Sequence, residues 1–286
     1  MNHIIFLFAS SLSIAILVSC SEDPKQNPIL PEAKGTIKGI VTETKTNAPL
    51  YYVSIKTIPE TKIVYTDQDG TFEIKDIKPG DYKVSAYLQG YDDDSAFVSI
   101  KDGDTAQVNM NLLHFSEYLD YYPLEIGNYW VYYQGSTPAY SIEIVSDTTV
   151  NNQHYFVSVF KQLAIGGTTE IRFERLDSYN ALVYRYSPYY EKEMIIDSLP
   201  AKPGQKFRCN MFNELNITRY SYCSGIEEEN IFGEMRLIRS LITASGLWPQ
   251  YKIVMGIGLY QFEFHRVGAY TCKYARINGI EYGEKP

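Results

Sequence analysis

The sequence contains no cluster of lysine and arginine residues, and acidic side chains outnumber basic ones. It has 26 Lys and Arg against 34 Asp and Glu, which gives a formal net charge of −8. Proteins that bind nucleic acids need a basic face that neutralises phosphates. We therefore expect no nucleic-acid partner.

The motifs of several common enzyme classes are also missing. There is no Gly-x-Ser-x-Gly elbow, no phosphate-binding glycine loop ending in Lys-Ser or Lys-Thr, and no His-Glu-x-x-His. Beyond the first 20 residues, histidine occurs only at His114, His154 and His265, which are widely separated. The run 227–229 offers glutamates of the kind that a glycosidase uses, but a charge run is typical of a solvated loop. We expect no catalytic site and no cofactor.

Only four cysteines are present, and none has the Cys-x-x-Cys spacing of a zinc site. Cys209 and Cys223 flank a predicted hairpin, and in an oxidising compartment we expect them to form a disulfide. The chain-entropy model gives such a bridge about 3 kcal/mol of stabilisation. Cys272 is expected to be a buried thiol, with its exchange into the bridge as the alternative.

The N-terminal apolar run is too short to span a bilayer, which requires about 20 apolar residues. It extends from Ile4 to Val18, the length of a signal-peptide core, and ends in Leu17-Val18-Ser19-Cys20. This ending resembles the bacterial lipobox, whose cysteine is lipidated and becomes the mature N-terminus. The resemblance implies that residues 1–19 are a lipoprotein signal peptide and that Cys20 carries the lipid. An ordinary secretory signal with a chance cysteine is the alternative.

The next residues resemble an export tag. Ser21-Glu22-Asp23 is similar to the acidic tripeptide that follows the lipidated cysteine in surface lipoproteins of Bacteroidetes-type bacteria. Residues 20–34 contain three prolines, which favour an extended tether. We therefore expect a protein that is lipid-anchored in the outer membrane and exposed at the cell surface.

Residues 35–114 show the patterns of a small β-sandwich. Asp69-Gly70 is a hairpin signal and Pro79-Gly80 a type II turn signal. Apolar and polar residues alternate between and after these turns, as they do in half-buried strands. Seven short strands are predicted: Thr36–Val41, Leu50–Lys56, Lys62–Thr66, Thr71–Lys75, Asp81–Leu88, Ala96–Ile100 and Ala106–Leu112.

This region resembles the carboxypeptidase-regulatory-like family, whose domain is a transthyretin-like sandwich of seven strands. The matching stretches are Gly35–Val41, Thr66–Phe72, Ile77–Tyr82 and Gly90-Tyr91. The family implies a structural or interaction module without catalysis of its own.

Residues 115–286 are predicted to form a second, tyrosine-rich β domain. Alternating stretches at 141–145, 171–176, 182–186 and 260–265 favour a curved antiparallel sheet or a barrel-like meander. Asn128–Tyr133 is apolar or aromatic on both faces, so we expect it to be covered twice. Met235–Ile242 fits either a short helix or an irregular strand pair.

Both ends of this region resemble poorly characterised bacterial lipoprotein domains. The opening stretch is Tyr122–Trp130, and the closing stretches are Gly256–Leu259 and Ile277–Gly283. These domains carry no assigned activity, so the resemblance implies a fold and no chemistry.

Two groups of residues suggest ligands. Tyr186, Tyr189 and Tyr190 near a Ser-Pro turn, and Tyr132-Tyr133 near a loop, could stack on sugars; the alternative is that tyrosine suits half-buried strands. Strand parity places two acidic segments at the same end of the sandwich. Their carboxylates are a candidate calcium site, with a solvated acidic rim as the alternative: Asp67, Asp69, Asp92, Asp93 and Asp94.

The sequence thus predicts a lipid-anchored envelope lipoprotein that acts as a non-catalytic binding or interaction module. Its partners are the membrane, through the lipid, and a glycan or an outer-membrane protein. One alternative is a glycan-capture accessory of an outer-membrane uptake system. The other is a hydrolase with an unrecognised site.

Overall fold

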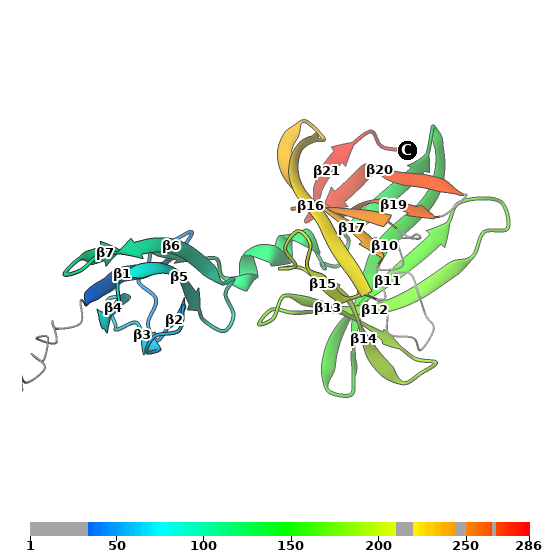
Figure 1. The fold of residues 1–286 in the computed structure, drawn as a ribbon. Helices are drawn as coiled ribbons and strands as arrows, with labels where there is room; N and C mark the ends of the chain where they lie inside the picture. The colour runs from blue at the N-terminus through cyan, green and yellow to red at the C-terminus, as the bar shows by residue number, and fades with distance from the viewer. Residues whose placement is uncertain (1–33, 210–219, 244–249, 265–266) are drawn as a thin grey trace, which may run out of the picture.

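A computed structural model describes residues 34–209, 220–243, 250–264 and 267–286. These residues form two β units joined by a short 3-10 helix, η1 (Phe115–Tyr121) (Figure 1). The predicted signal peptide, Cys20 and most of the predicted tether lie outside the described residues. No helix in the described part of the chain is long and apolar enough to cross a membrane.

The first unit is a sandwich of two sheets. One sheet has the order β4(Thr71–Ile77)-β1(Gly35–Glu43)-β7(Thr105–Gln107), and β8(Met110–Leu112) also pairs with β1. The other has the order β3(Val64–Tyr65)-β2(Ser54–Ile58)-β5(Gly80–Tyr87)-β6(Asp94–Ile100). The two sheets enclose one core, to which the alternating residues Phe72, Ile74, Val84 and Ala86 contribute.

Three details of this sandwich differ from the sequence prediction. The predicted strand Leu50–Lys56 begins only at Ser54, because Tyr51 and Tyr52 lie in a turn and Tyr52 has a φ of +63°. The turn at Asp69-Gly70 does not close a hairpin, because β3 and β4 belong to different sheets. The predicted strand Ala106–Leu112 is divided into β7 and β8 at Val108 and Asn109. There Val108 N donates to Lys38 O, while the Asn109 side chain, instead of a backbone carbonyl, accepts from Ile40 N.

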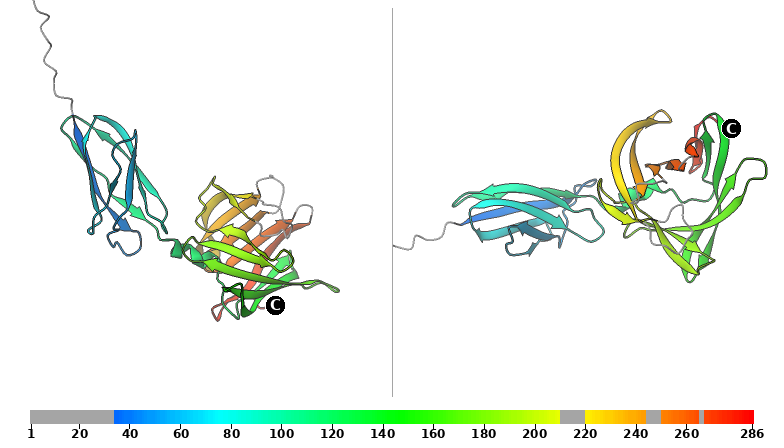
Figure 2. Two further views of the ribbon diagram at one scale, coloured as in Figure 1. Left: turned by 90° about the horizontal axis from the view of Figure 1, so that it is seen from below. Right: turned by 45° about the vertical axis from the view of Figure 1, so that its right-hand side comes forward.

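The second unit is one antiparallel sheet of thirteen strands that curls into a nearly closed barrel (Figure 2). Its strands, in chain order, are as follows: β9(Tyr129–Gln134), β10(Thr137–Val150), β11(Gln153–Gln162), β12(Thr169–Asp177), β13(Leu182–Ser187), β14(Lys192–Ser198), β15(Lys206–Arg208), β16(Tyr220–Ile231), β17(Glu234–Thr243), β18(Gln250–Val254), β19(Gly258–Phe264), β20(Gly268–Ile277) and β21(Ile280–Gly283). Pairing of β9 with β20 joins the two halves, and β14 and β15 form the ends of the sheet.

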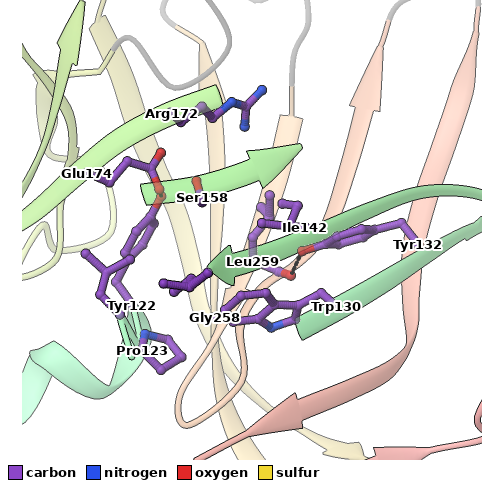
Figure 3. A pocket seen from close by; sticks show the side chains of 12 residues that line it. Tyr122, Pro123, Trp130, Tyr132, Ile142, Ser158, Arg172, Glu174, Gly258 and Leu259 are labelled. Atoms are coloured by element: carbon purple, nitrogen blue, oxygen red, sulfur yellow. Dashed lines mark hydrogen bonds between the residues drawn. The ribbon is translucent and has the colours of Figure 1, made fainter. Parts of the chain in front are cut away.

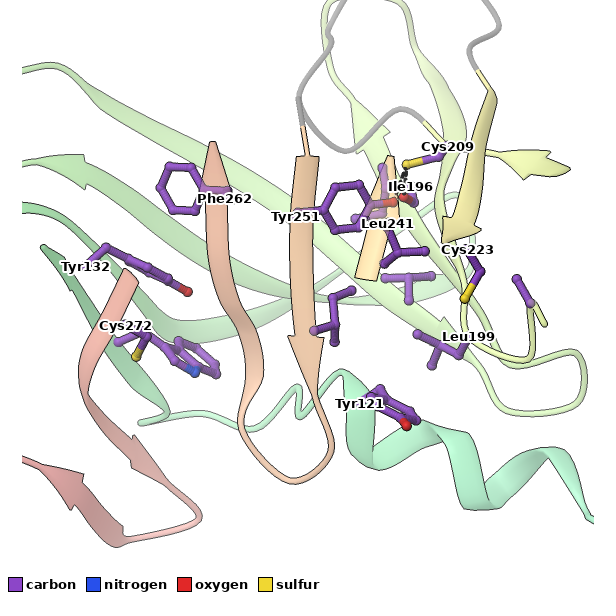
Figure 4. Close-up of a cluster of buried hydrophobic side chains, with 14 of the residues drawn as sticks. Tyr121, Tyr132, Ile196, Leu199, Cys209, Cys223, Leu241, Tyr251, Phe262 and Cys272 are labelled. Carbon is purple, nitrogen blue, oxygen red and sulfur yellow. Dashed lines mark hydrogen bonds between the residues drawn. The ribbon is translucent and has the colours of Figure 1, made fainter. Parts of the chain in front are cut away.

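Two open points of the sequence prediction are resolved by this sheet. The segment Met235–Ile242 lies in β17, which is a strand and not a helix. Three consecutive residues of β9 are buried, Trp130, Val131 and Tyr132, so this strand is covered on both faces as expected. Its inward rings join a core in which Tyr132, Tyr251 and Phe262 lie among aliphatic side chains (Figure 4).

The two units meet beside η1. The Tyr118 hydroxyl donates to the Asp92 carboxylate, from the loop that precedes β6. Lys202, between β14 and β15, lies 3.7 Å from Asp92 Oδ1 and donates to Asp93 O at 3.1 Å. Side chains from the sandwich, the linker and the barrel thus share one polar contact.

Candidate binding cavity in the barrel

The barrel contains a cavity near the end of η1, with a volume of about 40 Å³ (Figure 3). Twelve residues line it: Tyr122, Pro123, Leu124, Trp130, Tyr132, Ile142, Ile144, Ser158, Arg172, Glu174, Gly258 and Leu259. A volume of this size holds a few water molecules or one small polar group, because one water needs roughly 10–15 Å³.

Strand pairing explains why polar and apolar groups meet at the cavity. Ile144 pairs with Ser158, and Ser158 pairs with Arg172, so these three side chains point to the same face of β10, β11 and β12. Trp130 pairs with Ile142 and extends the apolar side of that face. The cavity therefore has an aromatic and aliphatic wall opposite a charged one.

Hydrogen bonds beside the cavity join segments far apart in the sequence. Trp130 Nε1 donates to Ile257 O at 2.6 Å. Asn128 Oδ1 accepts from Asn278 N at 2.7 Å, and Asn128 Nδ2 donates to Pro123 O at 3.1 Å. The opening and closing stretches noted in the sequence thus come together here, which the sequence did not reveal.

Gly258 is required at this junction. Its φ is +91°, and an added Cβ would lie 3.1 Å from Pro123 Cδ. A residue with a side chain would strain the backbone and crowd the proline.

The charged groups of the cavity are paired. Glu174 Oε1 accepts from Arg185, at 2.9 Å from Nε, and its Oε2 accepts from the Tyr122 hydroxyl at 3.2 Å. Arg172 forms a bidentate pair with Glu170, at 2.7 and 2.9 Å. These pairs neutralise the wall without leaving a net charge.

Ser158 differs from its neighbours. It is only 2% exposed, and its hydroxyl has no hydrogen-bond partner among the described residues. A buried hydroxyl without a partner costs free energy. It is therefore available to a ligand or a water in the cavity.

The two cavity tyrosines remain protonated. Burial raises the pKa of Tyr122 well above 10, and the negative Glu174 raises it further. Burial likewise raises the pKa of Tyr132, whose hydroxyl donates to Leu259 O at 2.7 Å. Both therefore act as hydrogen-bond donors and not as bases.

The predicted disulfide between Cys209 and Cys223 is not formed in the structure. Lys206 pairs with Tyr222, so Cys223 lies opposite Gln205, four residues before Cys209. Four strand residues span about 13 Å, whereas disulfides require Cα atoms within about 7 Å. Both cysteines are buried thiols, and Cys209 Sγ lies 2.8 Å from Ile196 O and 2.9 Å from the Tyr251 hydroxyl (Figure 4).

Cys272 is a buried thiol, as expected. Burial raises its pKa to about 12, and its Sγ donates to Tyr274 O at 3.2 Å.

The structure does not assemble the predicted calcium site. The two segments do lie at one end of the sandwich, where Gly70 O accepts from Val41 N and Leu113 O accepts from Asp92 N. Yet no three metal-ligating side chains come together anywhere in the described ranges.

The physical reason is that several of these carboxylates are engaged locally. Asp67 accepts three hydrogen bonds within its own turn, from Asp69 and Thr71. Asp92 binds Tyr118 and Lys202, and Asp94 accepts from Ser95 N and Asn111 N. Asp69 and Asp93 are exposed.

The other candidate residues are scattered. Glu227–Glu229 belongs to β16 and not to a loop, and Glu229 pairs with Lys252 at 3.0 Å. His114 caps η1, His154 pairs with Asp147 at 2.8 Å on the surface, and His265 lies outside the described residues. None of the described ones lines the cavity.

The tyrosines predicted to bind sugars do not form a platform. Tyr132 is fully buried, while Tyr133 and Tyr186 are half-buried. Tyr189 and Tyr190 are perpendicular at a hairpin tip, with ring centroids 4.8 Å apart.

Comparison with known families confirms the N-terminal assignment. Residues 37–120 match the CarboxypepD_reg-like domain, and this match covers less than a third of the chain. That part of the protein is therefore a CarboxypepD_reg-like β domain. No curated protein matches the chain.

Several solved structures are similar to this chain, with low TM-scores. A type II cohesin–X-dockerin complex from Acetivibrio cellulolyticus is 27% identical over 28% of this chain and 57% of that chain, with a TM-score of 0.24. The minor pilin GBS52 of Streptococcus agalactiae is 18% identical over 29% of this chain and 44% of that chain, also with a TM-score of 0.24. BcpA, the major pilin subunit of Bacillus cereus, is 9% identical over 87% and 94%, with a TM-score of 0.25.

The chain thus spans about half the length of the first two structures. Structural similarities with TM-scores this low establish no function for the chain.

Proposed function

We propose that this protein is a lipid-anchored, non-catalytic binding protein of the bacterial cell envelope, exposed at the surface of the outer membrane. Lipid on Cys20 would hold the chain, the CarboxypepD_reg-like sandwich would act as a spacer and interaction module, and the barrel would bind a small molecule. The lipobox-like sequence and the proline-rich segment after it support the anchor.

The barrel cavity is the observation that carries the binding role. Arg185 neutralises its Glu174 and Glu170 neutralises its Arg172, and its tyrosines are held protonated, so the wall is polar but carries neither a net charge nor a free base. The buried Ser158 hydroxyl remains to be satisfied. This arrangement suits recognition of one neutral polar group of a ligand, which enters beside the apolar wall of Trp130 and Ile142 and fills the cavity of about 40 Å³.

The hydrolase alternative receives no support from this cavity. A glycosidase needs two carboxyl groups roughly 5–9.5 Å apart that flank the bond to be cleaved. Glu174 is the one carboxylate among the lining residues, and Arg185 and Tyr122 already bind it.

Native mass spectrometry of protein purified from its own host tests the binding role. We expect wild-type protein to retain a small molecule, and Ile142→Trp, which fills the cavity, to lose it. The matched control is Ile171→Trp on β12, because Ile171 is 59% exposed and points away from the cavity. Absence of any retained molecule, or equal retention by Ile142→Trp, would contradict the proposal.

A further inference from the structure

Two exposed tyrosines of the sandwich stack on each other, far from the tyrosines singled out in the sequence. The rings of Tyr52 and Tyr65 have centroids 4.6 Å apart and an interplanar angle of 14°. They are 59% and 51% exposed. Stacking covers one face of each ring, so each tyrosine leaves one outer apolar face and its hydroxyl group to a ligand. We call this stacked pair the Tyr52–Tyr65 platform.

The backbone that presents this platform is strained and specifically held. Tyr52 has a φ of +63°, which is unusual for a bulky residue. Tyr52 N donates to Thr66 O at 3.0 Å. The buried Thr66 hydroxyl accepts from Val53 N at 2.9 Å and donates to Leu50 O at 2.6 Å.

Strain of this kind persists where the surrounding structure enforces it, and it concentrates at functional sites. Here the strained residue contributes an exposed ring and not a core contact. Its position is therefore better explained by binding than by packing.

A groove begins at Tyr65 and crosses the outer face of the sheet β4-β1-β7. Its volume is about 530 Å³, within the range of small-molecule sites of roughly 300–1,000 Å³. Pairing of Lys38 with both Glu73 and Gln107 places these three side chains in one row across the sheet. Asp67 lines the groove close to the tyrosine.

The groups of this groove select a class of ligand. The Lys38 ammonium and the Glu73 carboxylate supply a donor and acceptors. The Gln107 amide donates to Asn109 Oδ1 at 3.0 Å and keeps its oxygen as an acceptor, while Asp67 mainly serves its own turn. Glu73 is paired with Lys75 at 2.9 Å, and Lys38 balances Asp67, so the groove has no net positive charge that would favour an anionic ligand. The apolar surface consists of the Tyr65 ring, the half-buried Ile40 and the edge of Phe72, which is only 5% exposed, and this is too little for the side chains of a peptide.

We propose that the Tyr52–Tyr65 platform and this groove bind a neutral oligosaccharide. A pyranose has an apolar C–H face that stacks on an aromatic ring, and its hydroxyl groups both donate and accept hydrogen bonds. The sugar would stack at the tyrosine platform and extend over the row formed by Lys38, Glu73 and Gln107. This site lies on the sandwich, so it is independent of the cavity proposed for the barrel.

An array of neutral, uronic-acid-containing and sulfated oligosaccharides, probed with the full-length protein, tests this inference. Gluco-, xylo- and manno-oligosaccharides represent the neutral class, and isothermal titration calorimetry gives the Kd of each hit. We expect binding of a neutral oligosaccharide, and Tyr65→Ala should weaken it about tenfold. Tyr65→Phe keeps the ring and should retain most of the affinity.

Phe97→Ala is the matched control, because Phe97 is an 83% exposed ring on β6, at the other edge of the second sheet. It should leave the Kd unchanged. If thermal melting shows that Tyr65→Ala is unfolded, Gln107→Ala, which removes an exposed groove side chain, should weaken binding instead.

The inference is overturned if no neutral oligosaccharide binds, or if only acidic glycans bind. It also fails if a folded Tyr65→Ala variant binds as tightly as the wild type. If Tyr65→Ala is unfolded, the inference fails when Gln107→Ala binds as tightly as the wild type.

Discussion

Asp67 closes the turn at which the chain crosses from one sheet of the sandwich to the other. Its Oδ1 accepts from Asp69 N at 3.0 Å and Thr71 N at 2.8 Å, and its Oδ2 accepts from the Thr71 hydroxyl at 2.7 Å. These hydrogen bonds hold the pKa of Asp67 below its usual value of 3.8, and the bond from the Thr71 hydroxyl lowers the pKa most. The Asp67 carboxylate, which the sequence offered as a calcium ligand, therefore stabilises the turn instead.

This lowered pKa predicts how the stability of an Asp67 variant depends on pH. A carboxylate with a depressed folded-state pKa stabilises the protein above its unfolded-state pKa, and this contribution is lost as pH falls through the folded value. We expect Asp67→Asn to lower the Tm at pH 7, and the difference from wild type to shrink below about pH 4.

Thermal melts at pH 7, 5 and 3 measure this difference. Asp102→Asn, in another exposed turn, is the control and should change the Tm little at any pH. A Tm difference for Asp67→Asn that stays constant from pH 7 to 3 would contradict the account.

At the scale of elements, Gly39 determines how the short strands β7 and β8 pack beside β1. An added Cβ on Gly39 would lie 1.6 Å from Val108 O and 2.9 Å from the Phe72 ring. Val108 is the residue at which the predicted single strand divides. The missing side chain therefore lets the connecting backbone lie close against β1, beside which β7 and β8 keep the same register.

Gly39→Ala should consequently destabilise the sandwich, by about 1–3 kcal/mol or more, because the contact is with backbone that cannot move aside. Chemical denaturation followed by circular dichroism gives the free energy of unfolding. Gly225→Ala on β16 is the matched control, since its Cβ would meet only the flexible Glu227 carboxylate at 3.3 Å. Equal stability of the two variants would refute this explanation of the divided strand.

Elements whose signal is local could be predicted from the sequence. Alternation located the sandwich strands, and the aromatic run of β9 indicated a strand buried on both faces. Gly70 has the positive φ, +73°, that its turn required. These features depend on residues a few positions apart, so the sequence alone reveals them.

Features that depend on register or on distant partners could not be predicted in the same way. The Cys209–Cys223 prediction used spacing alone, and the register of β15 on β16 places the two cysteines too far apart. The cavity joins Pro123, Trp130 and Gly258, which come from opposite ends of the barrel sequence. The Tyr52–Tyr65 platform depends on the left-handed backbone conformation of Tyr52. Tyrosine rarely adopts this conformation, so the sequence does not suggest it.

At the scale of the whole molecule, the chain places two β units in series after its N-terminal segment. The sandwich connects to the barrel through η1, where Asp92, Tyr118 and Lys202 make a shared polar contact. Burial raises the pKa of Asp92, while Tyr118 and Lys202 stabilise its charged form. This contact links side chains of the sandwich, the linker and the barrel.

Such an arrangement suits a protein that is held at one end and binds at a distance from the membrane. Stable anchoring through lipid takes more than one acyl chain, which the lipobox-like cysteine would provide. Lipidation of Cys20 is therefore the premise on which the proposed localisation depends.

Detergent phase partitioning of the protein expressed in its own host tests this premise most directly. We predict that wild-type protein enters the detergent phase, that Cys20→Ala is found in the aqueous phase, and that Cys272→Ala, which removes a buried thiol, behaves like wild type. Recovery of Cys20→Ala in the detergent phase together with the wild type would contradict lipid anchoring, and with it the proposed place of this protein in the cell envelope.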